Sequence, residues 1–259
     1  MDTSSAFGKD GIGDKPDAFP AATADDFSNF VPGKHAAQAL VDLCREDKEL
    51  TLVCLGPLTN VALALKLDPS FANMPKKVVI MGGNYYGIGN VASRPTVEFN
   101  FYGDPEAAHI VLAEMQCPIV AVPWEAFVLE GKKHEAEVDF EAHLNLDTNL
   151  SRFLKAATSV IRAHMAEKHR QFAYCDEIAL SAAINPEKVI RQSRMLRVTV
   201  ELAGRLTRGQ VVVDWTHQPQ GDEDDIAEDL DMSQRPVQFV TSYDVKEVDE
   251  MMIDAVKKI

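Results

Sequence analysis

Short apolar segments that stop at glycine or proline alternate along this chain with segments of helical periodicity. The first two apolar runs are residues 50–56 (LTLVCLG) and 76–84 (KKVVIMGGN), and a third covers residues 117–124 (CPIVAVPW). Residues 35–47 and 58–69 repeat apolar side chains at the spacing of a helix face. A nearly continuous apolar run is typical of a parallel strand with both faces buried. The alternation therefore predicts an α/β fold with an open, mostly parallel sheet and helices on both faces.

The second half of the chain continues this mixture of helices and strands. Residues 146–170 show the periodicity of one long amphipathic helix, and residues 176–184 that of a short one. Two valine-rich segments on either side of the turn GRLTRG predict a hairpin, and residues 236–243 and 244–258 predict a last strand and helix. Because no repeat and no linker interrupts this pattern, we predict a single domain over residues 1–259.

The charge and the cysteines limit the classes of partner and compartment. The formal net charge is −14 and the pI is near 4.9, which repels nucleic acid and anionic membranes, so we expect neither as a partner. No run of about 18 apolar residues predicts a membrane span, and the N-terminal segment lacks the basic and apolar regions of a signal peptide. The four cysteines form no CxxC pair, which suits a reducing compartment. We therefore predict a cytoplasmic protein.

One polar segment lies between a strand and a helix of this pattern. Residues 97–111 read VEFNFYGDPEAAHIV, and Asp104 followed by proline is typical of a helix N-cap and first helical position. Glu98 and Asn100 precede this cap, with one aromatic residue between them. They are either ordinary loop residues or two polar side chains that point into a site at the carboxyl ends of the strands, where α/β sheets bind ligands.

Asp176 follows an irregular segment and begins the helix predicted over residues 176–184. It is either the N-cap of that helix or a ligand of a hard cation such as Ca²⁺, which prefers carboxylate and carbonyl oxygens. Cys175, the preceding residue, is either a core thiol or the polar edge of a pocket. The local sequence leaves both pairs of alternatives open.

Several segments of the chain, in the same order, resemble the inosine–uridine-preferring nucleoside hydrolase family. They span nearly the whole sequence and are GKDGIGD, LGPLTNVALAL, VVIMGGNYYGIGN, VEFNFYGDPEAAHIV, VPWE, CDEIALSAAINP and VELAGRLTRGQVVVDW. The resemblance implies the Rossmann-like nucleoside hydrolase fold. It implies a calcium-assisted hydrolase that cleaves the N-glycosidic bond of ribonucleosides to ribose and free base. It also implies a homodimer or homotetramer.

The resemblance assigns substrate-binding roles to five residues. Glu98 and Asn100 would hold the ribose hydroxyls, with the Glu98 carboxylate close to the positive charge that develops on the sugar. Phe99 would pack near the sugar or base, and Asn90 would reach the side of the 5′-hydroxyl. Met81 would line the floor of the ribose site.

The resemblance also implies a metal site and a group near the leaving base. Thr59 would give its backbone carbonyl and Asp176 its carboxylate to Ca²⁺, which would grip the ribose diol and activate a water. The family often carries a histidine before this aspartate, where it protonates the leaving base. This chain carries Cys175, and a thiol matches that role less well than an imidazole. Cys175 and Glu98 are the predicted catalytic residues.

The chain departs from the family in one larger respect. Family members begin with a strand and an aspartate cluster, DxDxxxDD, that supplies most of the calcium ligands and the base that activates water. This sequence contains no such cluster, and Asp222–Asp225 lie in an acidic run at residues 220–233 that is typical of a solvated loop. We therefore expect the first strands of the family fold to be missing, as in a truncated form or in a chain completed by a partner. We also expect weaker calcium binding and water activation.

Three hypotheses for the function follow. The first is a nucleoside hydrolase. The alternative is a catalytically impaired or inactive relative that binds a nucleoside or ribose, or that interacts with another subunit. The third is an unrelated α/β protein that binds a small molecule. The missing aspartate cluster favours the alternative for this polypeptide alone, but the family reaction is our prediction of what the site residues are for.

Overall fold

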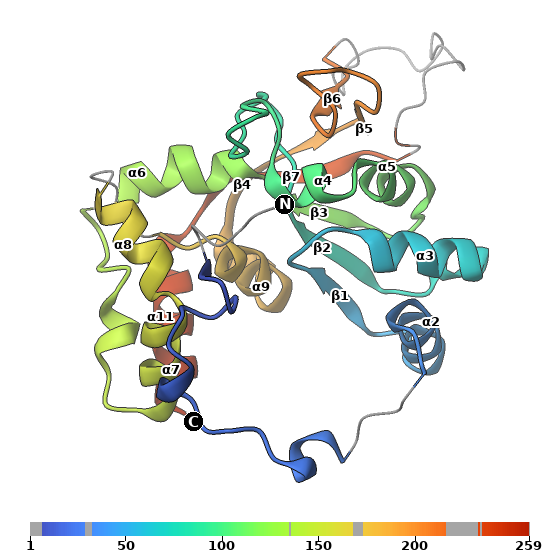
Figure 1. The fold of residues 1–259 in the computed structure, drawn as a ribbon. Coiled ribbons are helices and arrows are strands. Elements are labelled where there is room, and N and C mark those ends of the chain that lie inside the picture. The colour runs from blue at the N-terminus through green and yellow to red at the C-terminus, as the bar shows by residue number, and fades with distance from the viewer. Residues whose placement is uncertain are drawn as a thin grey trace, which may run out of the picture. The chain divides into compact units, whose positions relative to one another are not determined.

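A five-stranded sheet in the order β1-β2-β3-β7-β4 carries the residues of interest in the computed structural model (Figure 1). The structure describes residues 7–28, 33–134, 136–167, 173–215, 233 and 235–258. The strands are β1 (Thr51–Cys54), β2 (Lys77–Met81), β3 (Ile119–Val122), β7 (Val237–Tyr243) and β4 (Ile190–Leu196). β1, β2, β3 and β7 pair in parallel, and β4 pairs antiparallel with β7. The predicted mostly parallel sheet is confirmed.

The central strands are buried on both faces. All four residues of β3 are buried, and so are Val78–Met81 of β2. Since successive side chains of a strand point to opposite faces, protein must cover both sides of the sheet at these strands. α9 (Asp176–Ile184) packs against β1, β2 and β3, and a second layer of helices packs side by side (Figure 1). This layer contains α2 (Ala36–Glu46), α3 (Thr59–Leu67) and α5 (Pro105–Glu114).

The predicted hairpin is confirmed as a separate two-stranded sheet of β5 (Val198–Val200) and β6 (Val211–Val213). β5 also contacts α5. Ser233 lies beside this sheet, where its backbone N–H donates to Val198 O at 2.7 Å and its hydroxyl accepts from Val198 N at 3.1 Å. The acidic residues Asp222–Asp225 lie outside the described residues.

The chain divides into two compact units, which we call the sheet unit and the helical unit. The sheet unit comprises Lys34–Glu130 and Cys175–Asp244, and the helical unit comprises Met1–Gly33, Gly131–Tyr174 and Val245–Ile259. Every residue that the sequence analysis assigns to the site belongs to the sheet unit. This unit also contains short helices: η3 (Pro69–Asn73), α4 (Phe99–Gly103), η4 (Ala126–Glu130) and α10 (Pro186–Val189).

The helical unit shows where the prediction of one helix over residues 146–170 is wrong. The structure has α7 (Asn149–Ala157) and α8 (Ser159–Glu167), interrupted at Thr158. The Thr158 hydroxyl donates to Leu154 O at 2.7 Å, and such a side-chain bond to the preceding turn competes with helix continuation. The other elements of this unit are η1 (Pro16–Ala18), η2 (Ala24–Phe27), α6 (Gly131–His134), η5 (Ala142–Asn145) and α11 (Val245–Lys257). Within the described part of the chain, no helix is long and apolar enough to cross a membrane.

The turn after β2 depends on a glycine, which gives a first testable prediction. Gly83 has φ +70°, and a Cβ there would lie 3.0 Å from side-chain atoms of Phe101 and Val211. Gly83→Ala should therefore lower the free energy of unfolding by about 1–3 kcal/mol, measured by urea unfolding. Gly56→Ala is the matched control, because open space surrounds that position. It should be neutral or stabilise by up to about 1 kcal/mol; equal losses for both variants would contradict the account.

Candidate functional site

The side-chain amide of Asn100 ties the ends of two neighbouring strands together. β1 and β2 are aligned with Cys54 opposite Ile80, so the residues that follow them emerge side by side. Asn100 Nδ2 donates to Met81 O at 3.0 Å and lies 3.4 Å from Leu55 O. The side chain is buried. It therefore sits at the carboxyl ends of the strands, where parallel sheets place their ligand sites.

Glu98 is the N-cap residue of α4 and is only 1% exposed. Its Oε1 accepts from Asn100 N at 2.9 Å, and its Oε2 accepts from Phe101 N at 3.1 Å and Gly83 N at 3.0 Å. The first two bonds satisfy N–H groups of the first turn of α4 that have no helical partner. The third joins this turn to the glycine pair after β2. Glu98 is thus both a helix cap and a long-range link, and the short helix α4 precedes the helix that Asp104 caps.

Burial raises the pKa of Glu98 to about 7, and the charge of Asp176 adds to the rise. The three N–H donors act in the opposite direction, but the loss of water around the carboxyl outweighs them. A carboxyl whose pKa lies near neutrality can exchange a proton at physiological pH.

Asn90 and Phe99 are joined by one hydrogen bond. Asn90 Oδ1 accepts from Phe99 N at 2.7 Å, and Asn90 N donates to Val97 O at 3.1 Å. The Asn90 side chain thereby holds the entry to α4, where Phe99 follows the N-cap residue Glu98 in the chain. The structure thus brings Asn90 to the helix turn that Glu98 caps.

Two buried polar side chains hold the loop that leads from β2 to Asn90. Glu125, after β3, accepts from Tyr86 N at 2.8 Å and from Tyr85 N at 3.2 Å. Asn84 Nδ2 donates to Thr96 O at 2.8 Å and Ile88 O at 3.1 Å. Sequence reasoning gave neither residue a role, although each stands directly after a buried strand, in MGGN and VPWE.

Thr59 lies at the start of α3, and its hydroxyl donates to Asp104 Oδ2 at 2.6 Å. Asp104 also accepts from Ala107 N at 3.0 Å, which confirms it as the N-cap of α5. The backbone carbonyl after β1 that Asn100 Nδ2 contacts belongs to Leu55, which lies four positions before Thr59 in the chain. Thr59 thus joins two helix starts, a contact that the sequence did not indicate.

Cys175, and not Asp176, occupies the N-cap position of α9. The interpretation of Asp176 as an N-cap is therefore wrong, and Asp176 is the first helical residue. Surrounding protein atoms raise the pKa of its carboxyl to about 6, with the Glu177 charge adding to this, although the residue as a whole is exposed. Burial also raises the pKa of the Cys175 thiol, as do the charges of Asp176, Glu177 and Glu98. These mutual effects indicate that Glu98, Cys175 and Asp176 share one region of the sheet unit.

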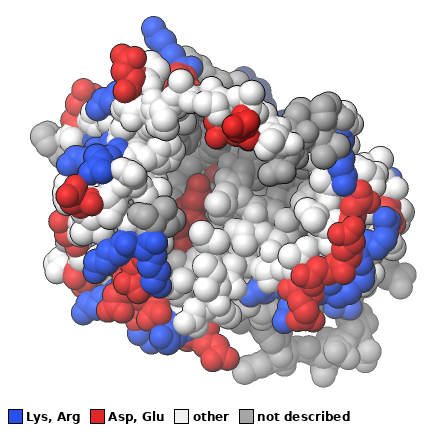
Figure 2. Space-filling view, turned by 90° about the horizontal axis from the view of Figure 1, so that it is seen from below, with Lys and Arg blue, Asp and Glu red and all other residues white. Residues whose placement is uncertain are grey.

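Basic and acidic side chains are interspersed on the surface of the protein. On the face in Figure 2, lysine and arginine side chains lie next to aspartate and glutamate side chains. Ion pairs among the described residues include Lys34–Asp42 and Arg45–Asp68.

Comparison with known families assigns the chain to one of them. A sequence profile of the family described as "Inosine-uridine preferring nucleoside hydrolase" matches residues 1–250. The chain belongs to this nucleoside hydrolase family. The matched region covers almost the whole chain and includes Glu98 and Asn100.

Relatives of known name agree with the assignment. The chain is 33% identical over 206 residues to the inosine-uridine preferring nucleoside hydrolase of Crithidia fasciculata. The matched region covers 76% of this chain and 60% of that protein. The chain is 32% identical over 196 residues to the enzyme of the same name from Leishmania major, covering 74% and 59%. The matched part therefore spans about 60% of the length of these relatives.

Solved structures show the same nucleoside hydrolase fold. An inosine-guanosine nucleoside hydrolase superposes with a TM-score of 0.78 at 30% identity, covering 97% of this chain and 74% of the other. A plant nucleoside hydrolase, PpNRh1, superposes with a TM-score of 0.79 at 24% identity, covering 99% and 75%. The second comparison concerns the fold alone.

The raised pKa of Glu98 gives a second prediction for this member of the family. The folded pKa of about 7 lies above the ordinary value of 4.5, so the folded protein holds the proton more tightly than the unfolded chain. Its contribution to stability is therefore complete below about pH 4.5 and declines by about 3 kcal/mol as the pH rises to 7. Unfolding free energies across this range should fall more steeply for the wild type than for Glu98→Gln. Parallel pH profiles would contradict the assignment.

Proposed function

We propose that this chain cleaves the N-glycosidic bond of ribonucleosides, which gives ribose and a free base. The observation that carries the proposal is the family match over residues 1–250, together with a buried carboxylate and amide at the carboxyl ends of parallel strands. Ligands of open α/β sheets bind at these ends. The ribonucleoside is the proposed partner.

In this proposal, Asn100 and Glu98 hold the ribose. The Asn100 Nδ2 group is committed to the Met81 and Leu55 carbonyls, so we assign its Oδ1 to accept a ribose hydroxyl. The Glu98 oxygens retain acceptor capacity beyond their N–H donors, since a carboxylate has about four lone-pair sites. Its charge, held in a site shielded from water, would stabilise the positive sugar that forms as the bond breaks.

The remaining substrate contacts are proposed for three residues near these two. Met81 would line the ribose floor, because its backbone carbonyl already contacts Asn100. Asn90 would reach the side of the 5′-hydroxyl and Phe99 would pack beside the sugar or base, and their mutual hydrogen bond would hold both in place. In support, Phe99 lies between Glu98 and Asn100 in the chain, Asn90 bonds to Phe99, and Met81 bonds to Asn100.

Cys175 and Glu98 are the proposed catalytic residues. The raised pKa of Cys175 keeps it a thiol at neutral pH, so it can offer a weak S–H donor to the departing base. It is a weaker acid than an imidazolium. We therefore assign more of the rate to Glu98 than to proton transfer from Cys175.

Calcium is the proposed cofactor by family, with the Thr59 carbonyl and the Asp176 carboxylate as its ligands in this chain. These residues do not make a calcium site by themselves, because Ca²⁺ takes 6–8 oxygen ligands. Among the described residues, no group of three or more histidine, cysteine, aspartate or glutamate side chains could hold a metal ion. Calcium binding by this chain would need further ligands, so no step of the proposed reaction is assigned to the metal.

We also propose a single domain, a homodimer or homotetramer, and a cytoplasmic location. The family resemblance supports the first two. All four cysteines are free in the structure, which supports a reducing compartment such as the cytoplasm.

Released ribose is the measurement that tests the proposed reaction. Purified chain with inosine or uridine, with and without Ca²⁺, should release ribose, and Asp176→Asn should lower the Ca²⁺-dependent rate by roughly tenfold or more, because it removes a proposed calcium ligand. The matched control is Glu49→Gln, since Glu49 is an exposed carboxylate that pairs with Lys76. This control should leave the rate within about twofold, because exposed pairs contribute little.

The alternative of a non-catalytic relative predicts a different result. Among the described residues, the absence of a metal-binding group is the observation that favours it. A folded chain that binds inosine in calorimetry without releasing ribose would support this alternative and contradict the proposed catalysis. Loss of inosine binding in Asn100→Ala would still assign the ribose contact to Asn100.

A further inference from the structure

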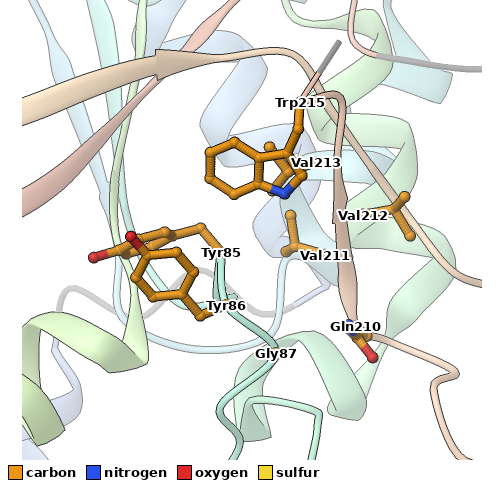
Figure 3. Close-up of a pocket in the computed structure, with 8 residues that line it drawn as sticks. All are labelled: Tyr85, Tyr86, Gly87, Gln210, Val211, Val212, Val213 and Trp215. Carbon is orange, nitrogen blue, oxygen red and sulfur yellow. The ribbon is translucent and has the colours of Figure 1, made fainter.

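A cavity of about 400 Å³ lies between the loop after β2 and the β5–β6 hairpin (Figure 3). Its walls are residues 85–87 from the loop and residues 210–213 and 215 from the hairpin. None of these residues has a role in the ribonucleoside site proposed above. The volume lies within the usual range of small-molecule pockets.

Aromatic rings form one side of this cavity. Tyr86 and Trp215 have ring planes within 15° of each other and centroids 6.2 Å apart, and Tyr85 and Tyr86 have centroids 4.3 Å apart. Tyr86 is 55% exposed and Trp215 is 42% exposed. Figure 3 shows the rings of Tyr86 and Trp215 near one another beside the hairpin valines. Exposed aromatic faces of this kind are suited to stacking with a flat ring.

The cavity wall contains one side-chain amide, that of Gln210. Its Oε1 is buried, so this oxygen does not contact a ligand in the cavity. No lysine, arginine, aspartate or glutamate is among the described lining residues, so the chemistry favours a neutral ligand.

Buried hydrogen bonds hold both walls in place before any ligand arrives. The Glu125 carboxylate accepts from the N–H groups of Tyr85 and Tyr86. Asn84 Oδ1 accepts from Val211 N at 3.3 Å, which links the loop to the hairpin. A cavity with fixed walls loses little conformational entropy when it binds a ligand.

We propose that this cavity is a second ligand site, separate from the ribonucleoside site, that binds a neutral planar aromatic ring. The ring stacks on Tyr86 and Trp215. The inference goes beyond the proposed reaction, because it depends on other residues and requires no bond cleavage.

Fluorescence of Trp215 tests this site with adenine as the probe. The chain has two tryptophans, so Trp124→Phe leaves Trp215 as the only one, and this variant keeps an aromatic ring against Phe127. Adenine should quench the remaining fluorescence to saturation. Tyr86→Ala should weaken binding by roughly tenfold, in line with the loss of one stacked ring. Calorimetry on the unmodified chain provides the same affinity without the Trp124 substitution.

A variant of the ribonucleoside site separates the two sites. Asn100→Ala should leave adenine affinity unchanged, whether or not the chain releases ribose. Absence of saturable quenching would overturn the proposal, as would binding lost in Asn100→Ala but kept in Tyr86→Ala.

Discussion

The hydrogen bonds of the Glu98 carboxylate hold together the part of the fold on which the candidate site depends. Its oxygens accept from Asn100 N and Phe101 N in the first turn of α4 and from Gly83 N after β2. One side chain thus fixes a helix start against a strand end 15 residues earlier in the chain. With that turn fixed, Asn100 reaches the Met81 carbonyl. The geometry of the site therefore follows from one buried carboxylate.

Buried polar side chains hold the neighbouring loop as well. Glu125 binds the N–H groups of Tyr85 and Tyr86, and Asn84 binds carbonyls at both ends of the loop and an N–H of the hairpin. A fully satisfied polar network of this kind gives a loop one conformation in place of many. The backbone N–H donors also partly replace the water that the Glu98 and Glu125 carboxylates lose, so each side chain is tolerated at 1% exposure.

The sequence predicted the parallel strands well, because apolar runs such as residues 76–84 and 117–124 report burial on both faces. It missed β4 (Ile190–Leu196), whose residues are mostly exposed and polar, since that strand lies at the sheet edge. It predicted that Glu98 and Asn100 could meet at a strand end, but not the bond of Glu98 to Gly83. Local patterns do not encode which distant N–H a carboxylate will bind. They also left open whether Asp176 caps α9, and in the structure Cys175 occupies the cap position.

The most direct test of the central role of Glu98 is amide hydrogen exchange in the native protein, followed by NMR. The N–H groups of Gly83 and Phe101 should exchange as slowly as those inside β2, because a buried carboxylate holds them. This protection is informative at Gly83 because its N–H bonds to a side chain and not to a strand partner. Exchange of Gly83 at the rate of an exposed loop would contradict the account.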